Sequence, residues 1–299
     1  MSRPNTCPNS WMPYVAALTA VALYSVMDAL MKGASLAVGA YSALLWRSLM
    51  GVVLMVPLWR LRGGRWPAGS ALRLHLLRGL VAAGVALAFF WGLERLPLAE
   101  AIAISFLAPL IALFLAAVTL GERVRRSAIV ASLIGLAGVV LIAGTRIQAS
   151  SHGEGAAWGV AAVLASAVLY AWNLVLQRRQ AQVAGPLEVT AFMNVTMAMV
   201  FLPAAPFLAH WPAAPLHQAE IIGSAVLAVT ALSLFSWAYA RAEAQALVPL
   251  EYSAFVWAAL MGWAMFGEGL TIPTLLGTTL VVAACLIAAP RADTEQTSI

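Results

Sequence analysis

The sequence contains very little charge. Only 10% of its 299 residues are Asp, Glu, Lys or Arg, and it has one lysine, Lys32, and two aspartates, Asp28 and Asp293. Soluble proteins carry about a quarter charged residues, so the composition excludes an ordinary soluble domain. The single lysine does not stand in a phosphate-binding P-loop motif, which excludes ATP-driven pumping by this chain.

Cysteine and histidine are also scarce. The two cysteines, Cys7 and Cys285, lie far apart and imply no disulfide framework. The four histidines fall in loops or at the ends of apolar runs, and HExxH is absent, so we expect no metal and no cofactor. The chain has no GxSxG elbow and no intramembrane aspartate pair. An intramembrane enzyme is therefore a minor alternative, and a channel or a purely structural membrane protein are the others.

Apolar residues are abundant. They make up 63% of the chain, and the mean hydropathy is +0.89. Runs of about 20 apolar residues indicate membrane-spanning helices, and the polar N-terminus does not resemble a signal peptide. The sequence thus predicts an all-α membrane protein with ten transmembrane helices, near residues 13–33, 40–59, 75–93, 98–119, 127–145, 156–177, 187–208, 220–239, 246–266 and 271–289.

The basic residues predict the orientation. With a cytoplasmic N-terminus, twelve of the seventeen basic residues fall on the cytoplasmic side and three, Lys32, Arg95 and Arg146, fall outside. The remaining two, Arg47 and Arg78, lie within spans. Because basic residues concentrate in cytoplasmic loops, both termini are predicted to be cytoplasmic. The excess of positive charge therefore serves topology, and no nucleic-acid partner is expected.

A Gly-Glu pair occurs twice, at 121–122 and 267–268, each time between two apolar runs. Five spans separate the two copies, which places them on opposite faces and explains why arginines follow only the first. Other residues match at the same offset of 146: Tyr24 with Tyr170, Lys32 with Arg178, Pro57 with Pro203, and FFWGLER (89–95) with FSWAYAR (235–241). This pattern predicts two five-helix repeats, 1–146 and 147–299, in inverted topology, which is typical of secondary transporters.

Each repeat has Gly-Glu between its fourth and fifth spans, and the fifth span of the first repeat (133–144) is rich in glycine. In these features the chain resembles the drug/metabolite transporter superfamily of EamA type. The chain looks most like the bacterial aromatic amino-acid exporters of that group. The resemblance implies a bacterial inner-membrane exporter of amino acids, aromatic and large apolar ones preferred, that works by alternating access as a monomer or weak homodimer. A multidrug or metabolite exporter of the same superfamily is the alternative.

The resemblance also implies a central cavity lined by the third, fourth, eighth and ninth spans, with the fifth and tenth spans set apart. In the tenth span Val281 and Ala284 stand opposite Gly135 and Gly138 of the fifth, which questions symmetric packing of these two helices. Glycines and alanines in the fifth span allow another helix to approach closely.

Aromatic and polar residues within the spans are the candidate substrate contacts. Rings that line a cavity would stack on a flat apolar side chain, while an amide, hydroxyl or carboxylate would meet its polar head. For Trp91 and Trp237, near the ends of their spans, the interfacial aromatic belt is the alternative. The candidates are Tyr170, Trp172 and Asn173 in the sixth span, Glu251, Tyr252 and Trp257 in the ninth, and Trp91 and Trp237.

Three further residues, Asp28, Arg47 and Pro109, are expected to have structural or coupling roles. Charges within spans are costly, so Asp28 and Arg47 are predicted to form an ion pair between the first and second spans, with direct substrate contact as the alternative. Glu251, one of the candidate contacts above, is expected to meet a substrate amino group or to carry a proton. The alternative is an interfacial carboxylate near Arg241. Pro109 is predicted to kink the fourth span. Because its mirror position holds Phe255, the two halves are expected to bend differently.

Overall fold

The computed structural model describes residues 11–120, 126–149, 153–181, 183–239, 241, 247 and 250–288, and the secondary structure assigned there is helical. The helices follow the apolar runs of the sequence and are joined by short connections. They are α1 (Met12–Val38), α2 (Ala40–Leu61), α3 (Gly69–Leu93), α4 (Leu98–Ser105), α5 (Leu107–Leu120), α6 (Arg126–Ala149), α7 (Gly153–Ala181), α8 (Pro186–Phe201), η1 (Leu202–Ala204), α9 (Ala205–Leu208), α10 (Pro215–Tyr239), α12 (Ala254–Phe266) and α13 (Ile272–Ala288).

Many of these helices suit a lipid environment. In the described part of the chain, six helical segments are long and apolar enough to cross a membrane, and four shorter apolar ones add to them. Large apolar side chains also cover the bundle surface, Phe207 and Leu61 among them, which are 85% and 86% exposed. A surface of this kind indicates a protein that lies in a bilayer. The all-helical membrane class is therefore confirmed, and the count of ten spans stays a prediction.

The fourth predicted span is broken between α4 and α5. Proline has no N–H, so Pro109 leaves the carbonyl of Ser105 without its helical donor, and α4 ends at that residue. The second half is also interrupted, because a turn at Tyr252 precedes α12 although the position that mirrors Pro109 holds Phe255. Tyr252 lies 146 residues after Phe106, the residue at the first break. Their rings pack edge to face with centroids 5.3 Å apart, so the two breaks meet.

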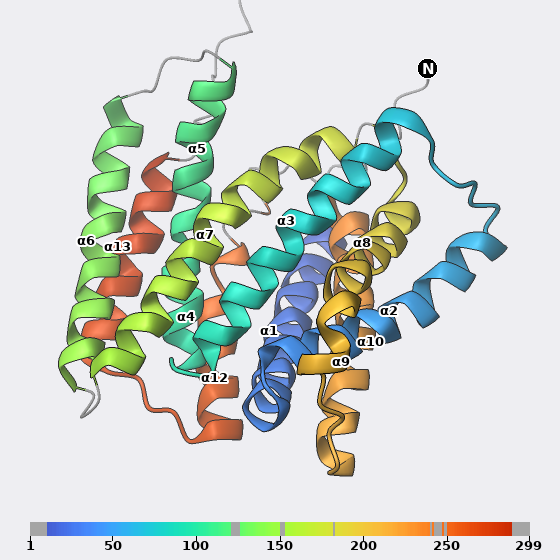
Figure 1. The fold of residues 1–299 in the computed structure, drawn as a ribbon. Coiled ribbons are helices and arrows are strands. Elements are labelled where there is room, and N and C mark those ends of the chain that lie inside the picture. The colour runs from blue at the N-terminus through green and yellow to red at the C-terminus, as the bar shows by residue number, and fades with distance from the viewer. Residues whose placement is uncertain are drawn as a thin grey trace, which may run out of the picture.

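The fifth and tenth predicted spans, α6 and α13, pack closely on each other (Figure 1). A Cβ atom added at Gly138 would lie 2.5 Å from the carbonyl oxygen of Gly277, and one at Gly277 would lie 2.7 Å from that of Gly138. Val281 and Ala284 are fully buried in the same contact. The two backbones therefore meet at Gly138 and Gly277, which answers the question raised by the unequal small residues of the two spans.

The remaining helices pair in a repeated pattern. The α1 helix packs along α10, and α3 packs along α7, while α2 contacts α8. Under the offset of 146, α1 corresponds to α7 and α3 to α10, so these two pairs are each other's counterparts. Figure 1 shows the C-terminal end of α1 and the connection from α12 to α13 at the lower side of the bundle. We call this the lysine end, after Lys32, and the opposite side the histidine end, after His75.

Candidate functional site

Charged and phenolic side chains gather in the middle of the bundle. Asp28 of α1 interacts electrostatically with Arg47 of α2, and Tyr24 of α1 interacts with both of them. Tyr170 of α7 interacts with Tyr24, with Asp28, with Arg78 of α3 and with Glu251. Ionisable residues within spans usually mark a functional site. We call these residues the central cluster: Tyr24, Asp28, Arg47, Arg78, Tyr170 and Glu251.

Asp28 and Arg47 do not form the direct ion pair that the sequence suggested. Their nitrogen and oxygen atoms are not within 4.0 Å of each other, and within the described chain Asp28 accepts no hydrogen bond. Nη1 of Arg47 points to the sulfur of Met27 at 3.3 Å, and its guanidinium carbon lies 5.9 Å from the centre of the Phe90 ring. The two charges are thus close enough to interact but are not joined.

Arg78 of the central cluster makes several hydrogen bonds to α7. It is buried, and it donates to the side-chain oxygens of Asn173 at 3.3 Å, of Gln177 at 3.1 Å, and of Gln180. These acceptors hold Arg78, which the sequence places within the third predicted span, inside the bundle. Asn173, Gln177 and Gln180 recur every three to four residues on one face of α7, and this spacing was the missed signal.

The hydrogen-bond network continues from Arg78 to the histidine end. Nε2 of Gln180 lies 2.5 Å from Nδ1 of His75, and Nε2 of His75 lies 3.0 Å from Oε1 of Glu188 on α8. His75 is buried, and its ring stacks on Phe192 with centroids 4.9 Å apart. A continuous polar chain therefore runs from Glu188 to the central cluster. Sequence reasoning missed His75 and Glu188 because they stand 113 residues apart.

Tyr170 and Trp172 face opposite sides of α7. Trp158, Ala161, Val168 and Trp172 are all exposed and share one stripe at helical spacing, whereas Ala167 and Ala171, beside Tyr170, are buried. Tyr170 is 40% exposed although it lies on the inner face, among the charges of the central cluster. Tyr170 therefore stands on the side of α7 that packs against protein. Trp172 points outward, and this placement does not support it as a substrate contact.

The paired tryptophans have matching surroundings. The guanidinium of Arg95 lies 3.5 Å from the ring centre of Trp91, and that of Arg241 lies 4.4 Å from the ring centre of Trp237. Each arginine also donates to the carbonyl of its tryptophan, four residues back. A tryptophan capped by arginine at the end of a span is typical of the membrane interface, so the geometry favours that alternative.

The remaining aromatic candidates lie around α12. Tyr252, which packs on Phe106, borders an apolar groove of about 370 Å³ between α12 and α13. Exposed Leu275 and Leu286 also border this groove, so it opens on the bundle surface. Trp257 is half-buried. Tyr252 is thus placed at the contact of the two helix breaks, and the groove beside it faces outward.

The second Gly-Glu pair makes the main contact of the lysine end. Gly267 ends α12 with a positive φ of 66°, which suits glycine, and the chain then turns so that Glu268 pairs with Lys32. Lys32 also donates to the carbonyl of Leu96 at 2.7 Å, and Oε2 of Glu268 accepts from the N–H of Leu98 at 2.8 Å. The Lys32–Glu268 pair therefore joins the end of α1 to the connection between α3 and α4 and to the connection between α12 and α13. The first Gly-Glu pair, 121–122, lies outside the described residues.

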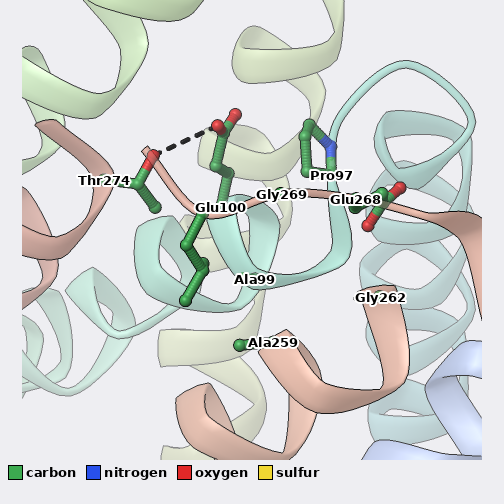
Figure 2. A pocket seen from close by; sticks show the side chains of 9 residues that line it. Pro97, Ala99, Glu100, Ala259, Gly262, Glu268, Gly269 and Thr274 are labelled. Carbon is green, nitrogen blue, oxygen red and sulfur yellow. Dashed lines mark hydrogen bonds between the residues drawn. The ribbon is translucent and has the colours of Figure 1, made fainter. Parts of the chain in front are cut away.

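A small pocket lies next to Glu268 at the lysine end. Figure 2 shows buried Glu100, which no sequence motif indicated, accepting a hydrogen bond from Thr274 at 3.2 Å. The pocket has a volume of about 10 Å³, which is near the minimum for one water molecule and far too small for a metabolite. Among the described residues no group of three or more His, Cys, Asp and Glu could hold a metal ion.

The fold and the charged centre define a multi-pass membrane protein of the transporter class. The model of the EamA-like transporter family matches residues 11–144 and 157–289, and the chain belongs to this family. The two matched segments fall on either side of residue 146, where the sequence predicts the boundary between the repeats.

Several curated relatives are similar over most of their length. A pseudopaline exporter, CntI, of Pseudomonas aeruginosa (strain UCBPP-PA14) is 25% identical over 265 residues, which cover 88% of this chain and 90% of the relative. An aromatic amino acid exporter, YddG, of Ancylobacter novellus is 29% identical over 210 residues, covering 66% of each. A riboflavin transporter of Brucella anthropi is 23% identical over 252 residues, covering 81% and 84%.

A solved crystal structure of a protein shares the fold. It aligns with a TM-score of 0.63 at 22% identity, over 92% of this chain and 97% of the other. The relatives carry different substrate names, so they show the family and leave the substrate to be argued from the site.

Proposed function

We propose that the protein is a secondary carrier of the bacterial inner membrane that exports small amphipathic metabolites, first of all amino acids with aromatic or large apolar side chains. The observation that supports this most is the central cluster. Asp28, Arg47 and Arg78 come from the first half of the chain, and Tyr170 and Glu251 come from the second. A site between two repeats is what alternating access requires, because each repeat then controls access from one side.

In this proposal ten spans form two inverted repeats, 1–146 and 147–299, with both termini cytoplasmic. The counterpart packing of α1 on α10 and of α3 on α7 supports this arrangement. The lysine end then faces outward and the histidine end faces the cytoplasm. The third, fourth, eighth and ninth spans line the path as the resemblance implies, and α1, α2 and α7 add the charged groups of the centre. The carrier works as a monomer or weak homodimer.

The alternative is a multidrug or metabolite exporter with the same architecture. It is favoured by the range of compounds named for the relatives, which include riboflavin and S-adenosylmethionine. Proteoliposomes loaded with each of the twenty amino acids, or with a lipophilic cation, should distinguish the two by counterflow. Saturable exchange of amino acids supports the proposed function. Exchange of cations alone supports the alternative, and flux that does not saturate indicates a channel.

The inverted topology can be tested by labelling single cysteines. After replacement of Cys7 and Cys285, a cysteine at Arg125 should react with an impermeant maleimide only from the cytoplasm, and one at Leu270 only from outside. The expected result follows from the odd number of spans between the two positions. Labelling of both cysteines from the same side would contradict the inverted repeat.

The two faces of α7 predict different effects on transport. Tyr170→Ala should lower the affinity for a phenylalanine-like substrate about 2- to 13-fold, because an aromatic contact contributes about 0.5–1.5 kcal/mol beyond buried area. Trp172→Ala should leave transport unchanged, since its side chain is on the outward stripe. The measurement is initial counterflow rate below saturation at matched protein amounts. A loss in Trp172→Ala equal to that in Tyr170→Ala would return Trp172 to the site.

A further inference from the structure

We propose that Asp28 and Arg47 hold the two ends of a zwitterionic substrate. The ammonium group of the substrate lies against the Asp28 carboxylate, and the carboxylate of the substrate lies against the Arg47 guanidinium. The proposal rests on the function proposed above and specifies the substrate class of its central site. It explains why two opposite charges stand within the spans, interact electrostatically and yet are not joined.

The first support is the set of hydrogen bonds that the two groups do not make. Arginine has five N–H donors, and within the described chain the Arg47 guanidinium donates to the sulfur of Met27, a weak acceptor. A carboxylate accepts only, and Asp28 has no donor among the described residues. Unpaired charges inside a membrane protein are costly, so each group is suited to a partner of opposite charge from outside the chain.

The second support is the contrast with Arg78. Three side-chain oxygens of α7 already engage the Arg78 guanidinium, so this residue has its structural partners within the fold. Arg47 and Asp28 are both partly accessible rather than fully buried. Of the two central arginines, Arg47 is therefore the one whose guanidinium has no oxygen acceptor in the described chain and is left to meet an incoming carboxylate.

The third support is the apolar surface beside the two charges. Tyr24 stands one helical turn before Asp28 on the same face of α1. The centre of its ring lies 5.7 Å from the centre of the Phe235 ring. The Phe90 ring lies beside the Arg47 guanidinium. An amino acid bound between the charges would thus place its side chain among aromatic rings, which favours a flat apolar side chain.

The test measures binding to the purified protein, so that it does not depend on transport. Three probes share one ring: L-phenylalanine carries both charges, phenethylamine only the ammonium, and 3-phenylpropionate only the carboxylate. Wild-type protein should bind phenylalanine about tenfold or more tightly than either of the others, because a hydrogen bond to a charged group is worth about that factor. Calorimetry or a ligand-induced thermal shift provides the dissociation constants.

Single substitutions should remove one preference each. Asp28→Asn should abolish the advantage of phenylalanine over 3-phenylpropionate and keep its advantage over phenethylamine. Arg47→Gln should abolish the advantage over phenethylamine and keep the advantage over 3-phenylpropionate. Arg95→Gln, at the lysine end, is the control and should leave all three constants unchanged. If Asp28→Asn does not fold, Asp28→Glu keeps the charge and should keep the ranking of the probes with weaker binding.

The results separate the two proposals. Equal binding of the three probes by the wild type, or no binding of any of them, overturns the zwitterion site. So does a double variant, Asp28→Asn with Arg47→Gln, that regains the folded yield lost in each single variant and binds phenylalanine normally, because this would show a structural pair. Absence of counterflow with every amino acid and lipophilic cation overturns the proposed function itself.

Discussion

Replacing Lys32 with methionine should lower the free energy of unfolding by about 3–5 kcal/mol, the usual effect of removing one partner of a buried ion pair. Lys32 is 4% exposed, and it bonds to Glu268 and to the carbonyl of Leu96. Methionine fills the same space but leaves the Glu268 carboxylate without its cation. The measurement is thermal unfolding of the purified protein at fixed lipid and detergent.

Two further variants make this result specific. Lys32→Met combined with Glu268→Gln should recover part of the loss, because the uncompensated charge is removed. Arg95→Met is the matched control: its side chain is 30% exposed against 5% for Lys32, and pairs with an accessible cation contribute about 0–1 kcal/mol. A Lys32→Met protein that unfolds at the same temperature as the wild type would show that the Lys32–Glu268 pair does not stabilise the lysine end.

Replacing Gly138 with leucine should separate α6 from α13 and prevent recovery of the folded protein. The first atom of any side chain there would meet the Gly277 carbonyl oxygen at 2.5 Å and Val281 at 2.8 Å. Backbone cannot move aside as a flexible side chain does, so we expect a cost at the upper end of the about 1–3 kcal/mol found for overpacked sites, or beyond it. Size-exclusion recovery and thermal unfolding measure the effect.

The control lies on the same helix. At Gly144 a Cβ atom would have no neighbouring atom within 4 Å, so Gly144→Leu should leave recovery and unfolding temperature close to those of the wild type. Equal behaviour of the Gly138 and Gly144 variants would mean that the close approach of α6 and α13 does not support the fold.

Features that depend on local chemistry were predictable from the sequence. Hydropathy alone indicated the apolar helices, because a bilayer requires about 20 apolar residues wherever a helix crosses it. The ring of proline has no N–H, so Pro109 predicted the break before α5. The matching strings 89–95 and 235–241 indicated equivalent local structure, and the Trp91–Arg95 and Trp237–Arg241 contacts have the same form.

The direction of a side chain around a buried helix was not predictable in the same way. Along α7 as far as Trp172, apolar residues occur on all sides, so this part of the sequence does not show which stripe meets lipid and which meets protein. Trp172 and Tyr170 were both predicted as substrate contacts, and the packing of α7 against α3 places them on opposite sides of the helix. The partners of Arg78 on α7 were not recognised either, because their spacing alone does not tell which neighbouring helix they face.

By itself, the sequence determined the helical membrane class and the helix break at Pro109, because these follow from composition and local chemistry. Only the tertiary structure decided which charges meet. Lys32 and Glu268 stand 236 residues apart and pair, whereas Asp28 and Arg47, only 19 positions apart, stay separate. The physical reason is that an ion pair depends on distances of a few ångströms, and helix packing sets these distances irrespective of separation along the chain.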